Sequence, residues 1–160
     1  MRASSSRVAI VGSFATVFLL ASHLPDAHAS ECLASSEVVV TSQVAVQVFA
    51  SGPLYPLQGV AVSLFWEGKT AVPTATGTTD SSGHLRVQGV PPGRYRVQVG
   101  IPGLKDQTMS LRVVSTTDAP SRLIAFALAG GLNCGTFCTV AGTSGPLARA
   151  PKCLDQTMRR

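Results

Sequence analysis

The sequence predicts an all-β sandwich, and three observations carry that prediction. Apolar and polar side chains alternate in several short runs, turn-forming residues separate those runs, and the chain after residue 29 has no helix-period segment of useful length. Because successive side chains of a strand point to opposite faces, such runs are typical of strands with one buried and one wet face. About seven of them follow one another at the spacing of a sandwich.

The clearest alternation lies in the central stretch, residues 59–100. Three runs within it place apolar residues at alternate positions: Val60, Val62, Leu64 and Trp66; Leu85 and Val87; Tyr95, Val97 and Val99. Asp80 to Gly83 predicts a type I turn before the second run, and Pro92-Gly93 predicts a type II turn before the third, with positive φ at Gly93. Because both connections are short, we expect these strands to pair as antiparallel neighbours.

Further strands are expected on both sides of this stretch. Residues 37–50 hold two strands or one bent strand, and 74–79 form a short threonine-rich edge strand. Residues 109–113 and 123–128 follow as two more apolar strands. The remaining residues, 129–160, are rich in Gly, Pro, Ala and Thr and contain three cysteines, which predicts an irregular, disulfide-held extension.

Residues 1–29 have the layout of a cleaved secretory signal. Two arginines give a positive start, residues 8–21 are apolar, and Ala27-His28-Ala29 is a small-x-small cleavage site. The apolar run falls short of the roughly 20 residues that a membrane span needs, which disfavours an uncleaved anchor. We therefore expect an exported protein, periplasmic or extracellular, with no stable membrane insertion after signal cleavage.

Removing 29 of the 160 residues leaves 131, which suffice for one core. We expect a sandwich domain over residues 30–128 and the extension over 129–160. The mature chain keeps eleven basic and seven acidic residues, a net charge of +4. The basic residues are scattered rather than consecutive, which argues against nucleic-acid binding.

The four cysteines, Cys32, Cys134, Cys138 and Cys153, agree with export because disulfides persist in oxidising compartments. Three connectivities are open. We favour Cys32 with Cys134 or Cys138, leaving the other for Cys153, because a bridge between Cys134 and Cys138 closes a very small loop. Their spacing fits neither a typical zinc site nor a two-residue redox motif.

Residues 57–99 resemble the carboxypeptidase regulatory-like family, and more broadly the prealbumin-like and Cna B-type sandwiches. The matching motifs are a Gly-Val-x-Val-x-Leu strand (59–64), a Thr-Thr-Asp-x-x-Gly turn (78–83) and a Val-Pro-Pro-Gly-x-Tyr-x-Val corner (90–97). The resemblance implies a seven-stranded Greek-key sandwich that serves as an accessory, adhesive or spacer domain of exported proteins. It does not imply peptidase activity.

No catalytic, cofactor-binding or metal-binding set is expected. His84 is the one histidine left after signal removal, whereas a zinc carboxypeptidase needs two histidines and a glutamate on the metal. The histidine set of transthyretin-like hydrolases and the lysine–asparagine pair of Cna B-type cross-links are also missing. A hydrolase centred on His84 with Asp80 or Asp118 stays open, but we expect His84 to lie on a wet strand face.

Two surface features are candidates for ligand or partner contact. If the strands around Leu85 and Val97 pair, Arg86, Arg94 and Arg96 share an outward face with His84, and Arg112 extends it. Such a face attracts an acidic glycan, a phosphate group or an acidic protein, although outward arginines also simply keep a sheet soluble. Tyr55, in a loop between two prolines, is the exposed aromatic candidate, whereas Trp66 is expected in the core.

The sequence thus favours a non-enzymatic exported module with a structural, adhesive or accessory role. Its partner is an unidentified protein or glycan. The alternative is a binder of glycans or small anions that uses the arginine face and loop aromatics.

Overall fold

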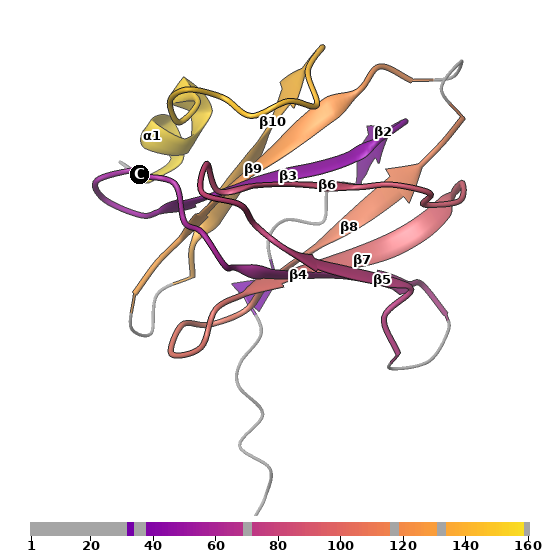
Figure 1. Cartoon of the computed structure of the whole chain (residues 1–160), viewed down its shortest axis with the longest axis horizontal. Helices are drawn as coiled ribbons and strands as arrows, with labels where there is room; N and C mark the ends of the chain where they lie inside the picture. The colour runs from indigo at the N-terminus through magenta and orange to yellow at the C-terminus, as the bar shows by residue number, and fades with distance from the viewer. Residues whose placement is uncertain (1–31, 34–37, 69–71, 116–118, 131–133, 159–160) are drawn as a thin grey trace, which may run out of the picture.

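The computed structural model describes residues 32–33, 38–68, 72–115, 119–130 and 134–158, in which two β-sheets pack face to face (Figure 1). The predicted signal, residues 1–29, lies outside these ranges. The elements in chain order are β1 (Cys32–Leu33), β2 (Val39–Thr41), β3 (Val44–Ala50), β4 (Ala61–Trp66), β5 (Ala75–Thr78), β6 (His84–Val87), β7 (Gly93–Gly100), β8 (Gln107–Val113), β9 (Arg122–Leu128), β10 (Thr136–Ala141) and α1 (Lys152–Met158).

The predicted all-β sandwich is confirmed, with more strands than the seven expected. The larger sheet has the order β1-β8-β7-β4-β5, with β2 also paired to β8, and the smaller sheet has the order β10-β9-β3-β6. Residues 37–50 contain two strands, β2 and β3, and the short β1 and the C-terminal β10 were not predicted. At the centre of the smaller sheet, β3 and β9 run parallel.

The core lies between the sheets and consists of the inward side chains of both. Its fully buried members include Val46, Val48, Val62, Leu64, Tyr95, Val97, Val99, Leu111, Ile124 and Phe126. The alternation predicted for the central stretch is therefore confirmed. Trp66 is half-buried and packs against this core, with its ring edge-on to Tyr95 at 5.0 Å between centroids, as expected.

The predicted antiparallel pairing along the central stretch is wrong. The predicted turn at residues 80–83 is present: the Gly83 amide donates to the Asp80 carbonyl at 2.9 Å. However, this turn carries the chain from β5 in the larger sheet to β6 in the smaller one, and β7 then returns to the larger sheet. Both short connections are thus corners between sheets, and β6 pairs with β3 while β7 pairs with β4 and β8.

The predicted type II turn at Pro92-Gly93 is also wrong. Gly89 has the positive φ in this connection (68°), and Gly93 is not among the residues with positive φ. Gly93 instead begins β7, where a Cβ atom would lie 2.8 Å from the Trp66 ring. The glycine is needed there for close approach of an aromatic side chain rather than for its backbone conformation.

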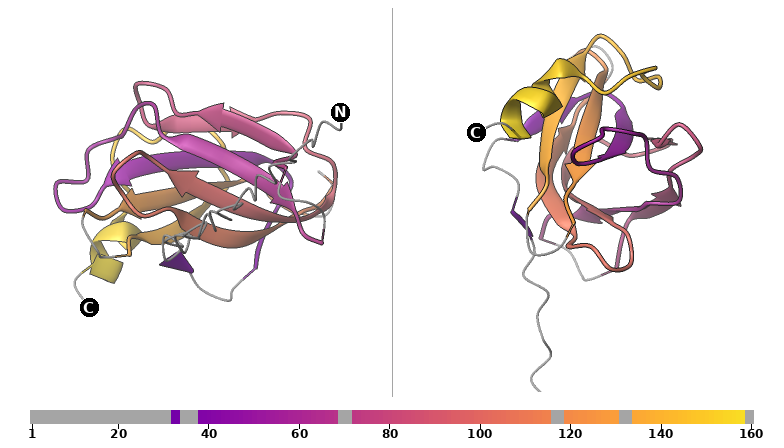
Figure 2. Two further views of the ribbon diagram at one scale, coloured as in Figure 1. Left: turned by 90° about the horizontal axis from the view of Figure 1, so that it is seen from below. Right: turned by 90° about the vertical axis from the view of Figure 1, so that its left-hand side faces the viewer.

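The C-terminal extension, residues 129–160, is more regular than predicted and covers the outer face of the smaller sheet. Strand β10 pairs along β9, and α1 packs against both strands on the side away from the larger sheet (Figure 2). A second apolar cluster forms beneath it from Phe49, Ala125, Ala127 and Leu154. The two central strands of the smaller sheet, β3 and β9, are therefore buried on both faces.

Gln47, at the middle of β3, binds the C-terminal extension through hydrogen bonds. Its buried side-chain amide donates to the carbonyls of Ser82 (2.9 Å) and Leu147 (3.1 Å) and accepts from the Leu147 amide (2.9 Å). Nearby, the His84 ring contacts the Ser144 carbonyl at 2.9 Å. These bonds satisfy a buried polar side chain and dock the extension on the sheet.

A disulfide joins Cys138 on β10 to Cys153 on α1, with 6.1 Å between their Cα atoms. Cys134 is also disulfide-bonded. The side chain of Cys32 lies outside what the structure describes, so its predicted pairing stays a prediction. Disulfides are compatible with an exported protein. No helix in the described ranges is long and apolar enough to cross a membrane.

Replacing Cys138 and Cys153 together with alanine should lower the free energy of unfolding by about 3 kcal/mol, because the bridge closes a loop of 15 residues. Urea unfolding of the oxidised protein measures this difference. Reducing the disulfides of the wild type should lower its free energy of unfolding by at least the same amount. An unchanged urea midpoint in the double variant would show that the Cys138–Cys153 bridge contributes nothing to stability.

Tyr95 offers a second test, because its hydroxyl donates to the Pro91 carbonyl at 2.8 Å and burial of its side chain raises the pKa of the phenol above 10.0. Tyr95→Phe should cost about 1 kcal/mol at neutral pH. In the wild type, the folded state favours the neutral phenol. The stability that this phenol contributes is complete below pH 10 and is lost as the pH rises through the raised pKa of the folded state. The free energy of unfolding of Tyr95→Phe should therefore fall less steeply than that of the wild type above pH 10.

Urea unfolding at several pH values measures both effects of Tyr95→Phe. Tyr55→Phe is the matched control, because Tyr55 is 55% exposed. Equal alkaline slopes for wild type and Tyr95→Phe would contradict the prediction.

Candidate interaction surface

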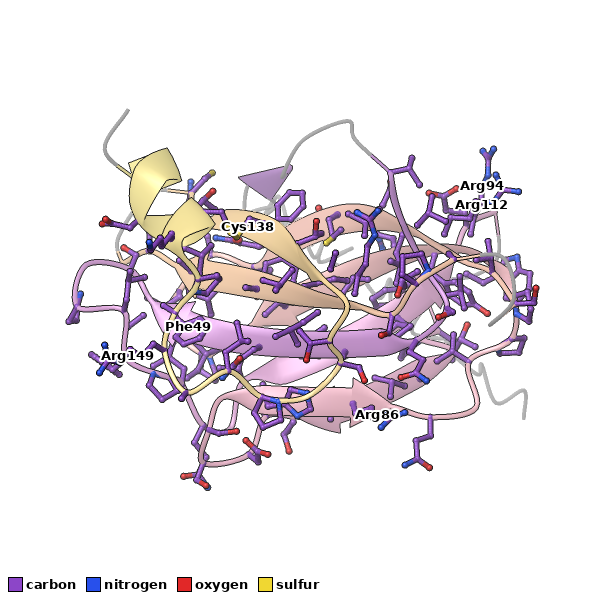
Figure 3. The ribbon with its side chains drawn as sticks, turned by 90° about the horizontal axis from the view of Figure 1, so that it is seen from above. Phe49, Arg86, Arg94, Arg112, Cys138 and Arg149 are labelled. Atoms are coloured by element: carbon purple, nitrogen blue, oxygen red, sulfur yellow. A yellow bond between two sulfur atoms is a disulfide. The ribbon has the colours of Figure 1, made fainter. Side chains whose placement is uncertain are left out.

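Three arginines lie on the outer face of the larger sheet. Arg94 and Arg96 occupy alternate positions of β7, and Arg112 lies on β8. All three are exposed, whereas their neighbours Tyr95 on β7 and Leu111 on β8 are buried. Arg94 is directly opposite Arg112 in the ladder, and Figure 3 shows the two side by side. We call Arg94, Arg96 and Arg112 the arginine row.

The pairing of Arg94 with Arg112 is electrostatically unfavourable. Like charges directly opposite each other across a ladder destabilise a sheet. Among the described residues, no carboxylate forms an ion pair with either side chain. The row is thus a concentration of positive charge suited to an anionic ligand.

Arg96 connects this charge to an aromatic side chain. It is opposite Phe65 of β4, and its guanidinium carbon lies 4.9 Å from the centre of the Phe65 ring. Such a cation–π contact holds the guanidinium close to the sheet. Phe65 was not among the residues singled out from the sequence.

Arg86 does not belong to the row, and its predicted shared face with Arg94 and Arg96 is wrong. It lies on β6 in the smaller sheet, where its Nη2 donates to Gln43 Oε1 at 2.9 Å. Figure 3 shows it apart from Arg94 and Arg112. Arg86 lines a separate cavity of about 260 Å³ between the ends of the two sheets.

His84 shares the outer face of β6 with the exposed Arg86, as predicted, but it is half-buried there rather than fully in contact with solvent. The extension covers it, and its Nε2 donates to a main-chain carbonyl. Asp80 accepts hydrogen bonds from the Ser82 hydroxyl and from the amides of Ser82 and His84, and these bonds lower the pKa of its carboxyl group. The Asp80 carboxylate therefore stabilises the corner at residues 80–83, while the His84 ring holds the extension.

Tyr55 is exposed, as expected, but lies away from the arginine row. Its carbonyl accepts from the amide of Ala50 at the end of β3. Figure 3 shows Phe49, which precedes Ala50, at the opposite end of the molecule from Arg94 and Arg112. Contact of Tyr55 or the arginines with a partner stays a prediction.

The described ranges contain no group of three His, Cys, Asp or Glu side chains placed to hold a metal ion.

Comparison with known proteins identifies a family domain within the chain. The model of the carboxypeptidase regulatory-like domain matches residues 43–129. No curated protein matches the chain. Among solved structures, Klebsiella pneumoniae 5-hydroxyisourate hydrolase is 20% identical with a TM-score of 0.47, over 64% of this chain and all of that one. Transthyretin from Sparus aurata is 18% identical with a TM-score of 0.47, over 67% of this chain and all of that one.

Removing one charge of the unfavourable pair should stabilise the protein. Arg112→Gln should raise the free energy of unfolding by about 0.5 kcal/mol at low ionic strength, and the gain should vanish near 1 M salt because salt screens the repulsion. Urea unfolding at both salt concentrations measures this, with Arg149→Gln as the control at an exposed site on the extension. Destabilisation by Arg112→Gln at low salt would contradict the prediction.

Proposed function

This chain belongs to the carboxypeptidase regulatory-like domain family, and we propose that it is a non-catalytic interaction module of an exported protein that binds an acidic partner through the arginine row. The observation that carries the proposal is the contrast between the two outer faces of the sandwich. The extension covers the outer face of β3 and β9 in the smaller sheet, where β6 still exposes Arg86, whereas the larger sheet presents three exposed arginines on two neighbouring strands.

The charge of this surface supports an acidic partner. Arginine binds carboxylates and phosphates through charge-assisted hydrogen bonds, often bidentate. A bound anion between Arg94 and Arg112 would also offset the repulsion between them. The strands on which the arginines lie fix the backbone at these positions, so binding orders only the arginine side chains and no loop.

Two observations support a non-catalytic role. The His84 ring is committed to the Ser144 carbonyl, and the Asp80 carboxylate is committed to its own turn. Within the described part of the chain, neither is therefore arranged as the base or orienting acid of a serine hydrolase.

The proposal is tested by binding of poly-L-glutamate and polygalacturonate to the mature protein. The double variant Arg94→Gln/Arg112→Gln should weaken binding at least tenfold, because two charge-assisted contacts are lost. Binding by the wild type should also weaken steeply as salt is raised. Biolayer interferometry measures both affinities.

Arg149→Gln/Lys152→Gln is the matched control, because it removes the same charge from exposed positions on the extension. An equal loss in both double variants would mean that net charge alone attracts the ligands. Absence of binding by the wild type to either polymer would refute the proposed function.

A further inference from the structure

A cavity of about 350 Å³ opens on the outer face of the larger sheet, at the end of β7 away from Arg94. The loop between β7 and β8 forms one wall, and side chains of β4 and β7 form the floor. The lining combines an aromatic ring, aliphatic groups and polar groups, from Phe65, Ile101, Leu104, Ser63, Gln98 and Asp106. This mixture is typical of sites for small organic groups.

The polar side of the pocket is held in place by the sheet itself. Gln98 Nε2 donates to Asp106 Oδ2 at 2.7 Å. Asp106 Oδ1 lies directly above Gly100, where any Cβ atom would collide with the carboxylate. The missing side chain at Gly100 thus lets the carboxylate lie against the strand, with Gln98 fixing its orientation.

The pocket is continuous with the arginine row through Phe65. This side chain lines the pocket and also carries the Arg96 guanidinium on its ring. Along β7, the outward residues run Arg94, Arg96, Gln98, a span of about 13 Å at roughly 3.3 Å per residue. One extended ligand can therefore contact the pocket and the arginines together.

We propose that this combined site binds an acidic glycan, with a sugar ring in the pocket and its acidic groups on Arg94 and Arg112. This inference rests on the proposed function and names the class of partner. Sugar hydroxyls donate to the Asp106 carboxylate and exchange hydrogen bonds with Gln98 and Ser63, while the apolar face of a sugar ring packs on Phe65. A uronic acid ring in the pocket would bring a second carboxylate next to Asp106, so we expect a neutral ring of the glycan to fill it, as hyaluronan can supply. Poly-L-glutamate has no hydroxyl groups to donate to Asp106 and gains nothing from the pocket.

The test compares two kinds of polyanion. The mature wild type, Asp106→Asn and Phe65→Leu are titrated with a panel of acidic glycans (polygalacturonate, alginate and hyaluronan) and with poly-L-glutamate. We expect each variant to weaken binding of at least one glycan fivefold or more. Binding of poly-L-glutamate should stay the same or, for Asp106→Asn, tighten.

Asp106→Asn keeps an acceptor for Gln98, and Phe65→Leu tests the same pocket through a different group if the first variant does not fold. Thermal unfolding of both variants verifies that they are folded. Unchanged glycan binding in the folded variants, or equal weakening for poly-L-glutamate, would overturn the glycan assignment.

The two proposals fail in different ways. If Arg94→Gln/Arg112→Gln weakens all polyanions while the pocket variants weaken none, the acidic-partner function stands and the glycan assignment is rejected. If the arginine variant weakens none, the function itself is rejected.

Discussion

Burial of β3 and β9, the central strands of the smaller sheet, on both faces is the constraint on which the rest of the structure depends. In β3, residues 44–49 are at most 1% exposed, although only every second side chain points into the space between the sheets. The outward side chains, including Gln47 and Phe49, need a cover, and the C-terminal extension supplies it. The arginine row is exposed on the outer face of the larger sheet, while Arg86 on β6 and Arg149 on the extension are exposed elsewhere.

The sequence predicts the strands well because alternation is a local property. The side chains expected inside, such as Leu64 and Val97, are fully buried, and the turn at residues 80–83 forms. It does not predict which sheet each strand joins, because a short turn serves a hairpin and a corner equally well. One missed signal was available: β3 and β9 lack alternation, which is typical of strands covered on both faces.

Only the part of the candidate site that depends on local spacing could be predicted from the sequence. That Arg94 and Arg96 share a face follows from their spacing alone, whereas placing Arg112 beside them depends on the register of β7 and β8. Excluding Arg86 requires knowing that β6 lies in the other sheet. The contact between Gln98 and Asp106 crosses a loop that has no distinctive sequence pattern, so its pocket was not foreseen.

The attachment of Leu147 to Gln47 spans 100 residues of sequence. Because synthesis begins at the amino end, β3 is made long before the segment that covers it. Until the segment around Leu147 and Leu154 is made, the outward side chains of β3, such as Phe49, lack their cover and expose apolar surface that is prone to aggregation. The last strand of the smaller sheet to be synthesised and the helix that follows it thus complete the burial of one of the first.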